Sequence, residues 1–204
     1  MAEVTTLGYA LLGLLAREPL SGYDLARLMR TPVGFFWHAR HSQIYPELAR
    51  LQAHGYVTYE VVPQRDRPDK KVYTITDAGR ELVREWAMAP LETPTVRDEL
   101  VLKAFSLWLT EPRRAAALFR EHERRHLAQL AEYREIEASL RRANPRWPGL
   151  DSPDFASYVT LQRGIGYERE YAAWCRWVAE QLERGPQATV PAGPREGEAD
   201  QPAD

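Results

Sequence analysis

The stretch that decides the fold runs from Ser42 to Thr76 and reads SQIYPELARLQAHGYVTYEVVPQRDRPDKKVYTIT. In its first third, Ile44, Leu48 and Leu51 have helical spacing and predict an amphipathic helix. The sequence places Gln43, Glu47 and Arg50 away from this apolar face. Gly55 predicts the end of the helix, because glycine adopts the left-handed backbone conformation at no steric cost.

Two β-strands are predicted after this helix. Residues 57–61 (VTYEV) alternate apolar and polar side chains, which indicates a strand half-buried on a core. Residues 72–76 (VYTIT) form a second run of β-branched and aromatic residues, and the loop between the strands carries Arg65, Arg67, Lys70 and Lys71. Helix, strand, basic loop and strand make up the layout of a winged helix. In that arrangement the helix enters a DNA major groove and the loop reaches the neighbouring phosphates or the minor groove.

Helices are also expected on both sides of this stretch. Residues 5–16 carry leucines at helical spacing, and Ser21 with Asp24 has the spacing of a capping box that begins a second helix. Thr76 and Asp77 cap a further helix that ends at Pro90. Residues 1–90 therefore predict a winged helix-turn-helix domain.

Residues 91–184 predict a helical domain, so the fold class is mainly α. One helix is expected over residues 96–109 with Trp108 facing inward, and two long helices over residues 112–143 and 154–184. The long helices form an antiparallel hairpin with an apolar seam that dimerisation would cover. Gly164 and Gly166 predict close backbone approach in the second long helix. Residues 185–204, rich in Pro, Gly and acidic side chains, are expected to be a disordered tail.

Composition restricts the function less than the motifs do. The 204 residues include 27 Lys and Arg and 29 Asp and Glu, while residues 1–90 hold 11 and 10. The basic signal is therefore confined to the loop at residues 63–71, which keeps open a winged helix that contacts protein and not DNA. The single cysteine, Cys175, fits a reducing compartment, and no signal peptide or membrane span is legible. We expect a cytoplasmic protein.

Three segments together resemble the PadR family of transcriptional regulators. They are LGYALLGLLAREPLSGYDLARLM (7–29), SQIYPELARLQAHGYV (42–57) and DKKVYTITDAGRELVREW (69–86). RGIGYEREYAAWCRW (163–177) resembles the C-terminal helix of the longer subfamily, whose helices clasp the other subunit. The resemblance implies a homodimeric repressor that binds a palindromic operator and is released by a small aromatic or hydrophobic effector. We expect no cofactor. A related regulator with MarR-like architecture is the alternative.

The helix that begins near Ser42 is the main candidate for base contacts. Free backbone N–H groups at a helix start favour phosphate, Gln43 can pair with adenine, and Arg50 could reach guanine or phosphate. Ser42 is expected to be the N-cap, and Tyr23 resembles a phosphate-facing tyrosine of the family. The candidate DNA-contacting residues are Tyr23, Ser42, Gln43, Tyr45, Arg50, Arg65, Arg67, Lys70, Lys71 and Tyr73. Helix capping, core packing and solvated surface charge are the alternatives for these side chains.

Two further sets of residues have weaker functional interpretations. Trp37, His38, Trp108, His126 and Trp174 are candidate effector contacts, with packing as the alternative for each. His122, Glu123 and His126 form an H-E-x-x-H pattern on a predicted helix, the spacing used by zinc hydrolases. Arg124 and Arg125 would place two cations beside the metal, and no third ligand is evident. The sequence therefore favours a protein that is not an enzyme and holds no metal.

Overall fold

The protein is described here by a computed structural model that covers residues 4–29, 41–64, 69–91, 97–143 and 149–185, together with Gly193. The chain divides into two compact units, residues 1–93 and 94–204. Within the described ranges, no helix combines the length and the apolar character that crossing a bilayer requires. The predicted tail, apart from Gly185 and Gly193, lies outside the described residues. So do four of the predicted contact residues, Trp37, His38, Arg65 and Arg67.

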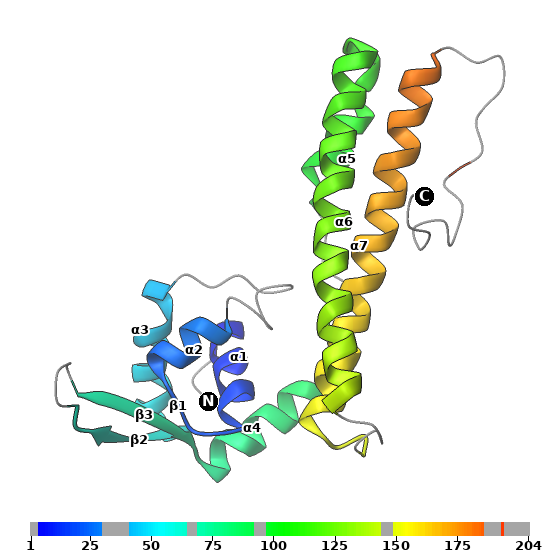
Figure 1. Ribbon diagram of the computed structural model, residues 1–204. Helices are drawn as coiled ribbons and strands as arrows, with labels where there is room; N and C mark the ends of the chain where they lie inside the picture. The colour runs from blue at the N-terminus through cyan, green and yellow to red at the C-terminus, as the bar shows by residue number, and fades with distance from the viewer. Residues whose placement is uncertain are drawn as a thin grey trace. The chain divides into compact units, whose positions relative to one another are not determined.

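The described residues of the first unit include four helices, α1 (Thr6–Leu15), α2 (Gly22–Leu28), α3 (His41–Ala53) and α4 (Asp77–Met88) (Figure 1). The predicted capping box is confirmed: the Ser21 hydroxyl accepts from the Asp24 amide while the Asp24 carboxylate accepts from the Ser21 amide. The Thr76 hydroxyl caps α4 by accepting from the Gly79 amide at 3.1 Å. These contacts satisfy amide groups that a helix start leaves without partners.

The strands β1 (Leu20–Ser21), β2 (Val57–Val62) and β3 (Lys70–Ile75) form an antiparallel sheet in the order β1-β3-β2. The two-residue strand β1 was not expected from the sequence. β3 begins two residues earlier than predicted, so Lys70 and Lys71 belong to the strand and not to the loop. Residues 57–61 were predicted to alternate between buried and exposed side chains. Val57 and Tyr59 are more buried than their neighbours, as predicted, but Val61 is 52% exposed on this edge strand.

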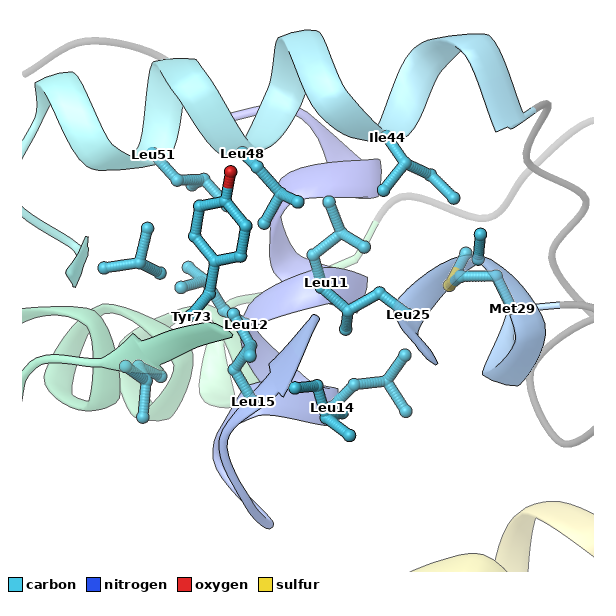
Figure 2. Close-up of a cluster of buried hydrophobic side chains, with 14 residues drawn as sticks. Leu11, Leu12, Leu14, Leu15, Leu25, Met29, Ile44, Leu48, Leu51 and Tyr73 are labelled. Atoms are coloured by element: carbon cyan, nitrogen blue, oxygen red, sulfur yellow. The ribbon is translucent and has the colours of Figure 1, made fainter. Parts of the chain in front are cut away.

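The core of the first unit lies between α3, α1, α2 and the sheet. Figure 2 shows Ile44, Leu48 and Leu51 pointing from α3 toward Leu11 of α1 and Leu25 of α2, and all five side chains are buried. This confirms the apolar face of the predicted helix. Gly55 has φ +74°, which confirms its role as the helix terminator.

α3 differs from the prediction in two ways. It begins at His41, so Ser42 lies inside its first turn and is not the N-cap. Glu47 is 2% exposed, although the sequence placed it away from the apolar face. The spacing of polar residues did not distinguish it from exposed neighbours, because burial of a carboxylate depends on partners supplied by other elements.

The second unit is built from α5 (Glu99–Phe105), the short 3₁₀ helix η1 (Leu107–Leu109), α6 (Pro112–Ala143) and α7 (Pro153–Arg184). α6 and α7 run side by side along their length, as predicted (Figure 1). Phe119 and Cys175 are fully buried between these helices and α5. The expected helix over residues 96–109 is broken at Ser106, and Trp108 is 80% exposed, so its predicted inward orientation is wrong.

The glycines of α7 separate into one that is packed and one that is not. A Cβ at Gly164 would lie 3.0 Å from the Tyr133 ring of α6, which confirms the predicted close approach there. A Cβ at Gly166 would meet nothing within 4 Å in the same chain, so the close approach seen at Gly164 is not repeated there within the subunit.

Candidate nucleic-acid interface

The outer side of α3 and the start of α2 place aromatic and amide side chains at the surface. Ser42, Gln43 and Tyr45 are exposed on the first turns of α3, and Tyr23 is 63% exposed at the start of α2. A Cβ at Gly22 would lie 2.5 Å from Cε1 of Tyr45, so the missing side chain at Gly22 lets the tyrosine ring lie against the start of α2. These exposed residues come from two helices whose opposite faces form the core.

Arg50 is exposed on α3 but is not an isolated charge. Its guanidinium pairs with Oε2 of Glu47, and Oε1 of Glu47 accepts from the Thr5 hydroxyl at 2.8 Å. The same hydroxyl accepts from the Gly8 amide and so caps α1. Glu47 therefore links the cap of α1 to the outward-facing arginine of α3.

The two lysines at the start of β3 have different partners. Lys70 Nζ lies 3.0 Å from Oδ2 of Asp24, whereas Lys71 Nζ lies 4.2 Å from the centre of the Tyr59 ring. The Ser21 hydroxyl and then Lys70 hold the pKa of Asp24 below its ordinary value. A carboxylate neutralises the charge of a nearby cation, but an aromatic ring does not. The contact of Lys71 with an uncharged ring therefore does not offset its charge, whereas the contact of Lys70 with Asp24 does.

Tyr73 is a core residue and not a surface one. It is 6% exposed and its ring lies 5.6 Å from that of Tyr59. Burial raises the pKa of its hydroxyl. We therefore remove Tyr73 from the candidate DNA-contacting residues.

The helical unit has an open cavity of about 400 Å³ beside α5 and α7. Half of its lining residues are aromatic, and the others include one cation and one anion: Val101, Arg163, Tyr167, Glu170, Tyr171 and Trp174. Three of the predicted effector contacts lie in the described part of the chain. Trp174 lines the cavity, and His126 packs against the lining residue Tyr171. Trp108 lies on the surface and away from the lining. The His126 ring stacks on that of Tyr171 at 4.3 Å.

Polar contacts behind the cavity join the start of α5 to α7, and α6 to α7. The Tyr171 hydroxyl donates to Asp98, the N-cap of α5, at 2.7 Å, and His126 Nδ1 lies 2.5 Å from Oε2 of Glu168. Burial alone would raise the pKa of Asp98, but the hydrogen bonds from Tyr171 and from two α5 amides together lower it. Sequence inspection missed these contacts, because the residues that they join are 42 and 73 residues apart.

The H-E-x-x-H residues lie on α6 with their side chains engaged by neighbours. The Glu123 carboxylate accepts from Arg120 at 2.9 Å and from Arg176 at 2.7 Å, while His126 faces Glu168. Burial, followed by the charge of Arg125, lowers the pKa of His122. Among the residues that the structure describes, no three His, Cys, Asp or Glu side chains are grouped to hold a metal ion.

The structure adds two carboxylates to the candidate site of the first unit that the sequence did not single out. Asp24 was recognised as a cap, but its pairing with Lys70 joins residues far apart in the chain and leaves no local signal. Glu47 lies three residues before Arg50, a spacing that indicates an ion pair on a helix and was available in the sequence.

Comparison with known proteins identifies relatives along most of the chain. Residues 11–85 match the transcriptional regulator PadR-like family, and residues 96–183 match the virulence activator alpha C-terminal family. The negative transcriptional regulator PadR of Bacillus subtilis is 34% identical over 180 residues, which cover 87% of this chain and 98% of the relative.

Solved structures show the same likeness. B. subtilis PadR in complex with operator DNA has a TM-score of 0.78 at 34% identity, covering 87% of this chain and 99% of that one. The same relative in complex with p-coumaric acid has a TM-score of 0.72 at 33% identity, covering 87% and 95%. The Vibrio cholerae virulence activator AphA has a TM-score of 0.68 at 29% identity, covering 88% and 99%. The chain therefore belongs to the PadR-like family of transcriptional regulators.

Proposed function

We propose that the protein is a sequence-specific DNA-binding regulator that inserts α3 into the major groove and sets its wing on the phosphate backbone. The observation that carries this proposal is that α3 has one buried and one exposed face. Ile44, Leu48 and Leu51 pack in the core, whereas Gln43 and Tyr45 are exposed to solvent. The solved complex of B. subtilis PadR with operator DNA supports the same use of the shared fold. Such a regulator acts in the cytoplasm, and its function requires no catalytic step.

We assign the contacts by chemistry. Gln43 reads base edges through its amide, and the hydroxyl groups of Ser42, Tyr23 and Tyr45 donate hydrogen bonds to phosphates or bases. Lys71 contacts phosphate, with Arg50 and Lys70 as weaker charges because each has a carboxylate partner. Arg65 and Arg67 are assigned to phosphate on their place in the wing sequence alone.

We further propose that residues 1–90 are the DNA-binding domain and that residues 91–184 join two copies. The α5 and η1 segment carries a stripe of exposed apolar side chains, which are Val101, Leu102, Phe105, Trp108 and Leu109. A second copy of the chain would remove this surface from water. Two-fold symmetry would place two α3 helices one duplex turn apart, about 34–36 Å, on a palindromic operator.

We propose that the regulator is a repressor released by a small aromatic effector. The B. subtilis relative is a negative regulator and has been solved with p-coumaric acid. In this chain the cavity beside Trp174 and Tyr171 offers aromatic walls of suitable size. An effector that binds better to a dimer with the wrong α3 spacing would lower operator affinity by linkage.

The deciding experiment is selection of bound fragments from a pool of random duplex DNA by the purified protein. We expect an enriched inverted repeat whose half-sites lie one helical turn apart. Recovery of no common sequence, with binding of a protein partner by the same surface, would instead support a protein-interaction module.

The assignment of Gln43 has its own test. Gln43→Ala should reduce affinity for the selected repeat by about 10-fold or more, because a bidentate base contact contributes about 1–3 kcal/mol of discrimination. Affinity for random duplex should change little. Equal losses on both duplexes would show that Gln43 does not read bases.

A further inference from the structure

Asp24 connects three parts of the DNA-binding unit. Its Oδ2 accepts from the Ser21 hydroxyl at 2.6 Å and lies 3.0 Å from Lys70 Nζ, while Oδ1 lies 4.0 Å from the guanidinium of Arg27. The carboxylate therefore caps α2 and holds the first residue of β3, where the wing ends. Its lowered pKa keeps it ionised at neutral pH.

Glu47 likewise links two parts of the unit, from its position on α3. Its carboxylate is buried, is fixed by the Thr5 hydroxyl at the start of α1, and pairs with the exposed guanidinium of Arg50. A buried carboxylate without such partners would be strongly destabilising. Asp24 and Glu47 thus each join a fixed point of the scaffold to a cation on the proposed DNA side. We call this pair the compensating carboxylates.

These pairs matter because charge alone supports binding to any DNA sequence. Each cation that neutralises a phosphate releases a counterion, so affinity for random duplex rises with the number of such cations and falls steeply with salt. A cation already paired with a carboxylate contributes less. The near balance of 11 basic and 10 acidic residues in residues 1–90 is consistent with deliberately weak non-specific attraction.

We propose that the compensating carboxylates, Asp24 and Glu47, are specificity-determining residues that weaken binding to random DNA by pairing Lys70 and Arg50. They also hold the wing and α3 in the positions that operator contacts require. The inference rests on the proposed DNA-binding function and adds to it the residues that limit non-specific affinity. The neighbouring cation Lys71 contacts the uncharged Tyr59 ring, so neither compensating carboxylate offsets its charge.

The test uses two isosteric variants, Asp24→Asn and Glu47→Gln, in the full chain. Each keeps an oxygen that can accept from Ser21 or Thr5, but each removes the negative charge. Affinity for a random duplex and for the selected inverted repeat is measured by fluorescence anisotropy across a salt series. Each variant should bind random duplex about 5–10-fold more tightly at 0.1 M salt, with a log–log salt slope steeper by about 1. The ratio of specific to random affinity should fall.

Glu81→Gln is the matched control. Glu81 pairs with Arg84 at 2.8 Å, with the same i, i+3 spacing as Glu47 and Arg50. This control pair lies on α4, which packs on α1 and is not part of the proposed DNA surface. It should leave both salt slopes unchanged. Thermal unfolding of every variant confirms that the fold is retained.

The neighbouring lysines give a second test that does not depend on altering a buried group. Lys71→Gln should flatten the slope on random duplex by about 1, and Lys70→Gln should flatten it clearly less, because its charge is already compensated. Equal losses, or unchanged slopes in folded Asp24→Asn and Glu47→Gln, overturn the inference. Failure of the unmodified protein to bind any duplex would instead overturn the proposed function.

Discussion

At the scale of single residues, the contact between Gly22 and Tyr45 shows how a position without a side chain shapes the proposed DNA surface. Gly22→Ala would place a Cβ 2.5 Å from the tyrosine ring and push it away from the start of α2. We expect weaker operator binding, measured by anisotropy, with a small change in stability. Gly13→Ala is the control, since a Cβ there meets nothing within 4 Å, and it should stabilise α1 by up to about 1 kcal/mol.

Asp24 also predicts a pH dependence of stability. Its pKa is lower in the folded protein than the value of about 3.9 expected when unfolded, so its ionised form stabilises the fold above that pH. This contribution is lost as the pH falls through the folded pKa. Asp24→Asn should therefore be less stable than the unmodified protein at pH 7, by about 1 kcal/mol or less, and the difference should shrink as the pH falls below the unfolded pKa. Urea titrations over a series of pH values from 7 down to acid measure the difference; a difference in stability that widens on acidification would contradict the assignment.

Cys175 should be unreactive in the native protein. Burial, followed by the charges of Glu123 and Asp98, raises the pKa of its thiol to about 12, and the residue has no exposed surface. Labelling with a thiol reagent at pH 8 should proceed only as fast as the helical unit opens, and should be immediate in denaturant. Complete labelling within the mixing time would show that the native packing leaves the thiol accessible.

At the scale of elements, the packing of α7 against α6 predicts different effects on stability for alanine at Gly164 and at Gly166. Gly166→Ala should stabilise the protein by up to about 1 kcal/mol, because alanine is the better helix former and nothing opposes its Cβ. Gly164→Ala should gain less or destabilise, because its Cβ meets the Tyr133 ring at 3.0 Å. Thermal unfolding of the two variants, which differ only in position, tests the packing. Equal stabilisation of both would mean that the Tyr133 ring moves aside without cost.

At the scale of the whole molecule, the exposed apolar stripe of α5 and η1 predicts the oligomeric state. The double change Phe105→Ser and Trp108→Ser should convert a dimer into a monomer, measured by light scattering. Operator affinity should then fall by about 100-fold or more, because a second half-site is no longer held at high effective concentration. Met88→Ser, an equally exposed apolar position on α4, should leave both properties unchanged. A double variant that remains dimeric would place the interface on other helices.

The effector proposal is tested on the same assembly. Addition of p-coumaric acid should quench tryptophan fluorescence and release the operator, and Trp174→Phe should diminish both effects. Quenching without release would separate binding in this cavity from regulation. Purified protein should carry no stoichiometric zinc, and zinc lost in His122→Ala would restore the metal interpretation of α6.

The sequence by itself determined the elements of this protein, because periodicity, caps and turn residues act over a few neighbours. The apolar faces of α3, α6 and α7, the Ser21 capping box and the Gly55 terminator were all legible in this way. Tertiary structure alone decided which side chains are buried and which charges far apart in the chain are paired. It buried Glu47 and Tyr73, exposed Trp108, and paired Lys70 with Asp24. Such outcomes depend on desolvation and on contacts between residues distant in the chain, and neither is encoded in local spacing.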